Sequence, residues 1–117
     1  MAEVNADSIL GSVRKLIGSD TYFDQDLILH INSVFASLQQ MGVGPEDGFA
    51  IEDETTVWSD YTGDTKIMNM VRSYMVLRVR LLFDNSTMSS YLMEQLRKEC
   101  SEYEWRLNVA CDKENKP

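Results

Sequence analysis

Carboxylates are the side chains of this sequence best suited to chemistry, and they cluster in one segment. The run Glu52, Asp53 and Glu54 and the stretch from Asp60 to Asp64 place several of them side by side. Such groups can bind a cation or share in proton transfer. The second stretch lacks the ligand spacing and the terminal Glu of a calcium-binding loop, and neither cluster has a histidine close in sequence. A solvated acidic surface is therefore the preferred interpretation.

The single histidine and the two cysteines add little further chemistry. His30 has no second His and no Cys nearby, which favours a structural role over a metal ligand or a general base. Cys100 and Cys111 are separated by about 16 Å along one predicted helix, so they cannot bridge each other and suggest a reducing compartment. The chain has no HExxH, GxSxG, Walker-type or CxxC motif. We expect no enzyme, no cofactor and no metal site.

The total length and charge restrict the classes of function. A chain of 117 residues fits one domain with a single core, here taken as 1–117 with flexible ends at 1–6 and 112–117. It has no apolar run of membrane-spanning length and no signal-peptide pattern, which predicts a protein made and kept in a cytoplasm. Its net charge of −8 divides into −10 for residues 1–64 and +2 for residues 65–117. This negative charge argues against binding to nucleic acid. The uneven distribution of charge suits head-to-tail association of copies; the alternative is that both halves are simply solvated.

Apolar residues recur at steps of three and four over four stretches, and this period predicts four helices. They cover residues 8–17, 24–40, 64–83 and a last stretch from 87 or 89 to about 110. A side chain able to cap the helix stands at each start: Asp7, Asp24, Asp64, and Ser89 or Thr87. Phe23 is expected to pack on Ile28 as a hydrophobic staple. The predicted fold class is mainly α, a small four-helix domain with a long acidic loop or short-strand arm between the second and third helices.

That connection covers residues 43–63 and contains no basic residue. Its large apolar side chains argue against disorder, because exposing each of them would be unfavourable by about 1.5–3 kcal/mol. These side chains are Phe49, Ile51, Val57, Trp58 and Tyr61. Short strands near 49–51 and 55–58 are one possibility. An ordered arm that packs on a neighbouring copy is the favoured interpretation.

Two residues depart from the patterns of their helices. Arg78 falls within the apolar stripe of the third helix, either with its stem packed and its head in water, or in an ion pair or subunit contact. Trp105 falls opposite the buried seam of the last helix, in line with Tyr91 and Lys98. It is either an interface anchor or part of a broader core.

Five segments also occur in a recognisable order along the chain. They are SVRKLIG at 12–18, FDQDLILHINSVFASLQQMGVGP at 23–45, Trp58, VRLLFDNSTMSS at 79–90 and EWRLN at 104–108. Together they resemble the head–tail connector (head-completion adaptor) family of tailed bacteriophages over about residues 8–108. One departure is Asn85-Ser86, where many relatives have prolines after the Phe-Asp pair.

The resemblance implies a mostly helical structural protein of the virion, assembled in the host cytoplasm as a ring of about twelve copies. Such a ring would join the portal of the head to the stopper or tail-completion protein and extend the DNA channel, with no sequence-specific nucleic acid binding and no membrane. The candidates for contact between copies are Phe49, Ile51, Trp58, Arg78 and Trp105. The candidates for portal docking are Leu107, Cys111, Asp112 and Lys113. The alternative is a stand-alone helical adaptor or regulator that binds a partner helix or peptide in a groove between helices.

Overall fold

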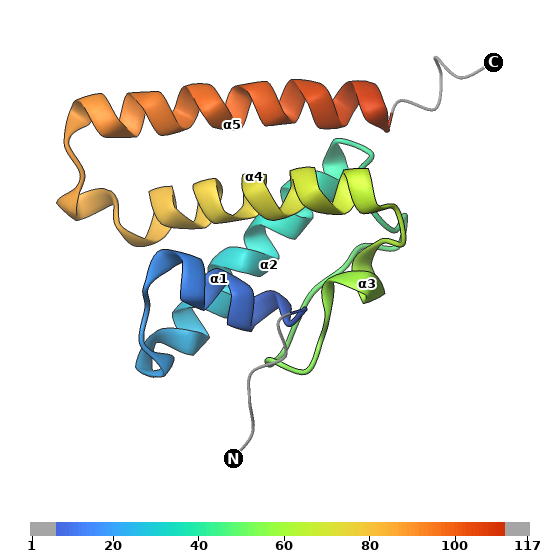
Figure 1. Cartoon of the computed structure of the whole chain (residues 1–117), viewed down its shortest axis with the longest axis horizontal. Coiled ribbons are helices and arrows are strands. Elements are labelled where there is room, and N and C mark those ends of the chain that lie inside the picture. The colour runs from blue at the N-terminus through green and yellow to red at the C-terminus, as the bar shows by residue number, and fades with distance from the viewer. Residues whose placement is uncertain (1–6, 112–117) are drawn as a thin grey trace.

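The computed structural model describes residues 7–111, and it confirms the mainly α fold class (Figure 1). Within this range, the five α-helices are α1 (Ile9–Ile17), α2 (Asp24–Gln40), α3 (Trp58–Tyr61), α4 (Thr65–Phe83) and α5 (Ser90–Ala110). Short 3-10 helices, η1 (Thr21–Phe23) and η2 (Asn85–Thr87), precede α2 and follow α4. The flexible ends expected at 1–6 and 112–117 lie outside the described residues.

Local capping explains where most of the predicted helices begin. The Asp64 carboxylate accepts hydrogen bonds from the backbone N–H groups of Lys66 and Ile67, and the Ser89 hydroxyl accepts one from Leu92, as expected. The cap of α1 is Ser8 rather than Asp7, because the Ser8 hydroxyl accepts from the N–H of Gly11. Helix α2 has no side-chain cap, because Asp24 lies inside its first turn.

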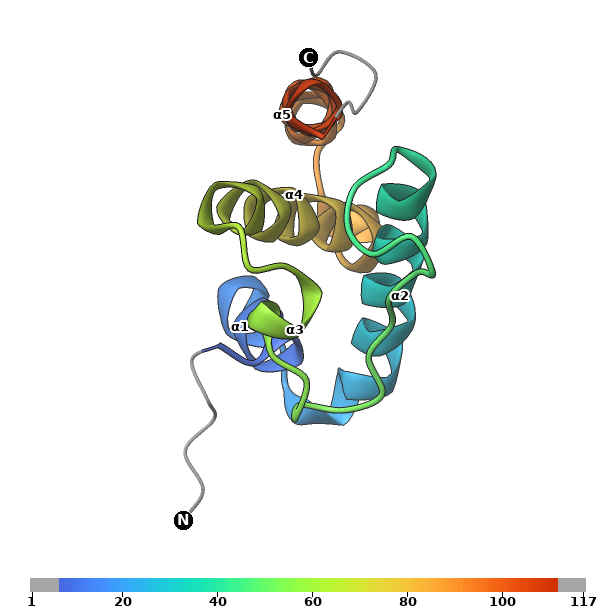
Figure 2. The same cartoon turned by 90° about the vertical axis from the view of Figure 1, so that its right-hand side faces the viewer.

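Helix α4 is the centre of the fold. Figure 2 shows it between α5 on one side and α1 and α3 on the other, while α2 crosses beside it. The α4 side chains Val71, Tyr74, Met75 and Val79 are all completely buried. Helix α5 packs on α4 far more extensively than on any other element. Its position therefore depends on one neighbouring helix.

The connection between α2 and α4 contains the short helix α3 instead of strands. The expected strands are absent from the described residues, and a single antiparallel bridge joins Ser8 to Val57. The connection passes close to the ring of Tyr61 at Gly44, which has a φ of 87°. A Cβ atom there would lie 2.5 Å from the Tyr61 hydroxyl oxygen, so only glycine allows this approach.

Candidate interaction surfaces

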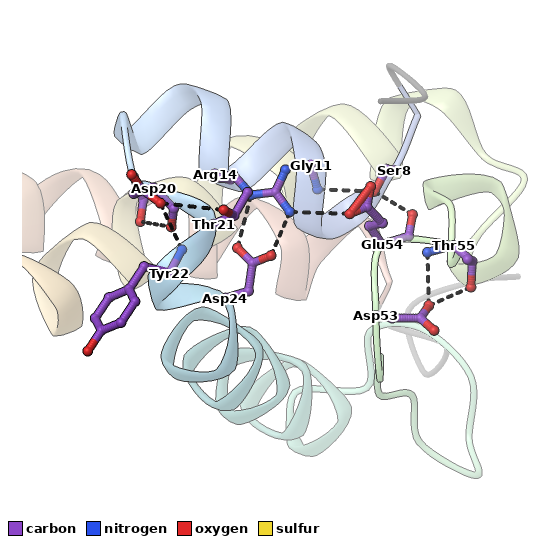
Figure 3. Close-up of polar contacts among 11 residues, drawn as sticks. Ser8, Gly11, Arg14, Asp20, Thr21, Tyr22, Asp24, Asp53, Glu54 and Thr55 are labelled. Carbon is purple, nitrogen blue, oxygen red and sulfur yellow. Dashed lines mark hydrogen bonds and ion pairs between the residues drawn. The ribbon is translucent and has the colours of Figure 1, made fainter. Parts of the chain in front are cut away.

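The connection between α2 and α4 is held to the rest of the chain by partly buried polar contacts, several of which are drawn in Figure 3. The Arg14 guanidinium donates two hydrogen bonds to the Asp24 carboxylate, at 3.0 and 2.8 Å, and lies 3.6 Å from Glu54. The hydrogen-bonded Asp24 carboxylate raises the pKa of Arg14, so this cation stays charged. The Ser8 hydroxyl donates to the backbone carbonyl of Glu54 at 2.8 Å. Arg14 and Ser8 thus tie α1 to both α2 and the connection.

Backbone groups of the connection are also satisfied within the chain. The side-chain amide of Asn32 donates to the carbonyl of Ile51 at 3.0 Å and accepts from its N–H at 2.8 Å. The N–H of Ile9 donates to the carbonyl of Thr56, and the N–H of Trp58 donates to the carbonyl of Asp7. Backbone groups about fifty positions apart in sequence are therefore hydrogen-bonded to each other outside any sheet.

Three residues predicted to contact a neighbouring copy lie in this region, and each of them packs within its own chain. Trp58 and Ile51 are only 1% and 2% exposed and belong to the core of their own chain. The Trp58 indole donates to the Ser12 hydroxyl at 2.9 Å. Phe49 is half-buried, with its ring 4.9 Å from that of Phe35. Trp58 therefore belongs to the chain's own core, and Phe49 packs against that core with part of its surface exposed.

Arg78 takes part in an ion pair inside the chain, one of the two alternatives that its position allowed. Its guanidinium donates to the Tyr74 hydroxyl at 2.6 Å, and Tyr74 donates to the Glu104 carboxylate at 2.6 Å. Arg78 also lies 3.7 Å from the same Glu104 oxygen. Burial and the hydrogen bond to Glu104 raise the pKa of Tyr74 well above its ordinary value. These three residues form a polar link between α4 and α5.

Helix α5 has a second face, which is exposed. Its buried seam on α4 is formed by Leu96, Cys100 and Leu107. At 100° per residue, the opposite side carries Tyr91, Lys98, Trp105 and Val109, a line of about 27 Å. Tyr91, Trp105 and Val109 are 73%, 68% and 56% exposed. Trp105 is thus a surface residue rather than part of a broader core.

The candidates for portal docking lie around the end of α5. Leu107 is completely buried within the chain, in the seam of α5 on α4. Cys111 is half-buried at the C-terminal cap of α5. Asp112 and Lys113 lie outside the described residues.

An open groove lies between α4 and α5, beside the end of α1. Its volume is about 460 Å³. Its lining contains four apolar residues and one charge of each sign: Leu16, Val76, Leu77, Tyr103, Arg72 and Glu99. Leu16 is 54% exposed at the edge of this groove. Sequence reasoning missed the groove because its walls come from α1, α4 and α5, which are far apart in the sequence.

A second exposed apolar group lies where α2 begins and α4 ends. The Phe23 ring is 5.7 Å from the Phe83 ring, and Tyr22 packs edge-on against Phe23 at 5.0 Å. His30 borders the same group, with its ring 6.4 Å from that of Phe83. Phe23 therefore packs on Phe83, sixty positions away in the sequence. The predicted local staple on Ile28 gave no indication of this contact.

Comparison with known proteins decides the family. The sequence model of the family described as phage connector protein matches residues 9–114. This chain belongs to the phage connector protein family. The match covers all five helices and both 3-10 helices of the structure. No curated protein and no solved structure matches the chain.

As a connector, the protein is a structural component of the virion. Its functional residues are therefore to be sought on surfaces. Residues 7–111 contain no group of three or more His, Cys, Asp or Glu side chains placed to hold a metal ion. Over the same range, no helix of the connector is long and apolar enough to cross a bilayer. The α5 outer line, the groove and the aromatic group around Phe23 are the surfaces on which partners could bind.

Proposed function

We propose that this connector protein assembles in the host cytoplasm into a ring of about twelve copies at the junction of the phage head and tail. The ring joins the portal to the stopper or tail-completion protein and extends the channel through which the DNA passes. The observation that carries this proposal is the family match over residues 9–114. The exposed surfaces of the structure support it, because a ring needs contacts on two different sides of each subunit.

The distribution of exposed features suits a ring more than a symmetric dimer. A ring forms when one patch of a subunit binds a different patch of the next, and the rotation closes. The connector has different apolar patches on different elements, namely the outer line of α5 and the group around Phe23 on η1 and α4. Residues 1–64 carry twelve of its nineteen acidic residues, while α4 and α5 carry seven of its eleven basic ones. Because the two halves of the chain differ in charge, head-to-tail contact between copies is favoured.

The net charge supports the role of the channel wall. At −8 per subunit, the connector repels the phosphates of DNA rather than binding them. A repelling wall lets the DNA slide, which both packaging and ejection require. We accordingly propose no sequence-specific contact with nucleic acid.

We assign portal docking to the segment that follows α5, beginning at Cys111 and including Asp112 and Lys113. This segment follows a helix that packs chiefly on α4 alone, so it can engage a second protein without disturbing the rest of the core. A chain that ends at Cys111 should keep its helical content but lose binding to the portal protein. Binding at the original affinity would remove this assignment.

Native mass spectrometry of the protein, alone and mixed with the portal protein encoded beside it, tests the ring. Twelve copies of the 13.4 kDa chain would give a closed species of about 160 kDa. A stoichiometric complex with the portal would equally support the proposal, because ring closure can require the portal as a template. A protein that stays monomeric in both experiments would contradict it.

The groove between α4 and α5 favours one alternative, a stand-alone adaptor that binds a partner helix or peptide. At about 460 Å³, with apolar walls, it is large enough for side chains of a second protein. A monomer that ignores the portal but binds an amphipathic helix in this groove would support the adaptor. A gene located away from portal and capsid genes would do the same.

A further inference from the structure

Helix α5 exposes an aromatic side chain on one side and borders the groove on a different side. Trp105 is 68% exposed, and Glu99 and Tyr103 of the same helix line the groove. At 100° per residue, Trp105 points about 140° away from the midpoint of Glu99 and Tyr103 around the helix. Trp105 therefore cannot reach the groove of its own chain. Only a second molecule can bring the two together.

The groove has the chemistry that an indole ring requires. Leu16, Val76, Leu77 and Tyr103 form apolar walls, and Leu16 is left 54% exposed by its own chain. The polar side chains of Asn69, Ser73 and Glu99, which also line the groove, offer oxygens to the indole N–H. A groove of about 460 Å³ accommodates one such side chain.

The charges beside the indole and those in the groove are complementary. Glu102 and Arg106 flank Trp105 and pair with each other at 3.8 Å on the surface. Arg72 and Glu99 line the groove. Each side presents one acid and one base, so Arg106 of one copy can pair with Glu99 of the next, and Glu102 with Arg72. An exposed pair such as Glu102–Arg106 is worth little by itself, so exchanging partners costs little.

We propose that Trp105 of one copy inserts into the groove between α4 and α5 of the next copy. The proposal rests on the proposed ring and names the two surfaces that build it. Because the indole and the groove are different patches on different sides of α5, each subunit uses one to bind forward and the other to bind backward. Such a contact can repeat from copy to copy around a ring.

Two variants, each missing one surface, test the contact. Trp105→Ala removes the inserting side chain, and Ser73→Trp fills the groove from an exposed position in its lining. Each variant alone should lose association by about thirtyfold or more, the loss typical of a central aromatic anchor. The matched control is Leu29→Ala, which removes an equally exposed apolar side chain (68%) from α2, outside both surfaces, and should retain ring assembly.

Mixing the two variants gives the decisive readout by native mass spectrometry. The Ser73→Trp chain keeps Trp105 but has a filled groove, and the Trp105→Ala chain keeps the groove but has no indole to insert. The two chains can therefore form one contact with each other and no second contact. The mixture should therefore yield a one-to-one dimer of about 27 kDa, twice the 13.4 kDa chain, and no ring. Circular dichroism of each variant checks that its helices are intact.

A charge exchange tests the orientation of the two helices. Arg106→Glu and Glu99→Lys should each weaken association by about threefold to tenfold, and the double variant should recover most of the loss. If the unaltered protein stays monomeric with and without the portal protein, the ring and this contact both fail. A ring that forms equally well with Trp105→Ala, or a mixture of the two variants that stays monomeric at high concentration, would overturn the contact and leave the ring standing.

Discussion

The connection between α2 and α4 and the helix α5 use aromatic side chains in opposite ways. The connection buries Trp58, Ile51 and Tyr61 in the core of its own chain and is fastened by Asn32 and Arg14. Helix α5 leaves its tryptophan exposed and depends almost entirely on α4 for its position. An aromatic residue in a long acidic loop therefore indicates a folded loop, whereas one opposite the buried seam of a peripheral helix indicates a binding surface.

The two tryptophans offer the largest expected contrast. Trp58→Ala should lower the free energy of unfolding by about 3–5 kcal/mol, because it empties a buried site and leaves the Ser12 hydroxyl without its donor. Trp105→Ala, at 68% exposure, should change it by less than about 0.5 kcal/mol. Urea denaturation of both variants measures the difference. Equal losses would contradict the division between core and surface.

Any effect of Trp58→Ala on ring assembly should therefore follow from unfolding. Repeating the assembly measurement at low temperature, where the variant is folded, separates the two causes. A folded Trp58→Ala protein that still fails to assemble would restore Trp58 as a contact between copies.

The fastening by Arg14, which joins α1 to α2 and reaches Glu54 of the connection, should produce the next largest effect. Asp24→Asn removes the charge that Arg14 binds at 2.8 Å and leaves that buried guanidinium with Glu54 at 3.6 Å. The expected loss of stability is about 1.5–3 kcal/mol, the range for a hydrogen bond to a charged group. Asp26→Asn, an exposed change in the same turn of α2, is the control and should cost less than about 0.5 kcal/mol. Similar values for both variants would show that Arg14 does not fasten α1 to α2.

Helix starts could be predicted from the sequence because they depend on neighbouring residues. The caps Asp64 and Ser89 lie next to the helices that they begin, and both were predicted. The residues of the same chain on which the connection packs could not be predicted in the same way. Contacts such as that of Ser8 with Glu54 join residues 46 positions apart. In addition, aromatic side chains are frequent both in cores and in interfaces, so their presence does not distinguish the two.

The candidate surfaces were predictable to a similar extent. The helical period placed Trp105 opposite the seam, and the exposed side chain agrees with that position. The groove could not be found, because its walls come from three helices whose arrangement is set by packing. The pairing of Arg78 with Glu104 likewise required the relative position of α4 and α5.

The link between α4 and α5 should make a smaller contribution than the fastening of the connection. Tyr74→Phe keeps the ring but removes the hydroxyl between Arg78 and Glu104. We expect a loss of about 1–2 kcal/mol, since the two charges remain 3.7 Å apart and partly exposed. Hydrogen exchange should speed up in α5 more than in α2, because α5 has few other contacts. The control is Tyr103→Phe, which removes the hydroxyl of another tyrosine on α5. Uniform acceleration over both helices would show that α5 opens only when the whole chain unfolds.

The smallest effect concerns Cys100, which lies in the seam between α5 and α4. Burial raises the pKa of this thiol from its ordinary value of 9.0 to about 11. The folded chain therefore keeps a proton that the unfolded chain releases above pH 9, and the stabilisation present at neutral pH is lost as the pH rises towards 11. Between pH 8 and pH 10 the loss should be about 1–1.5 kcal/mol.

Cys100→Ala isolates this contribution, because the pKa values of Tyr61 and Tyr74 are also raised by burial and both tyrosines remain in the variant. Urea denaturation at several pH values should show a shallower fall in stability for Cys100→Ala than for the unaltered chain. The same slope in both proteins would mean that the thiol is already accessible to water in the folded state. Helix α5 would then be loosely attached along its whole length, and Trp105 would not be held at a fixed angle to the groove, which insertion into a neighbouring copy requires.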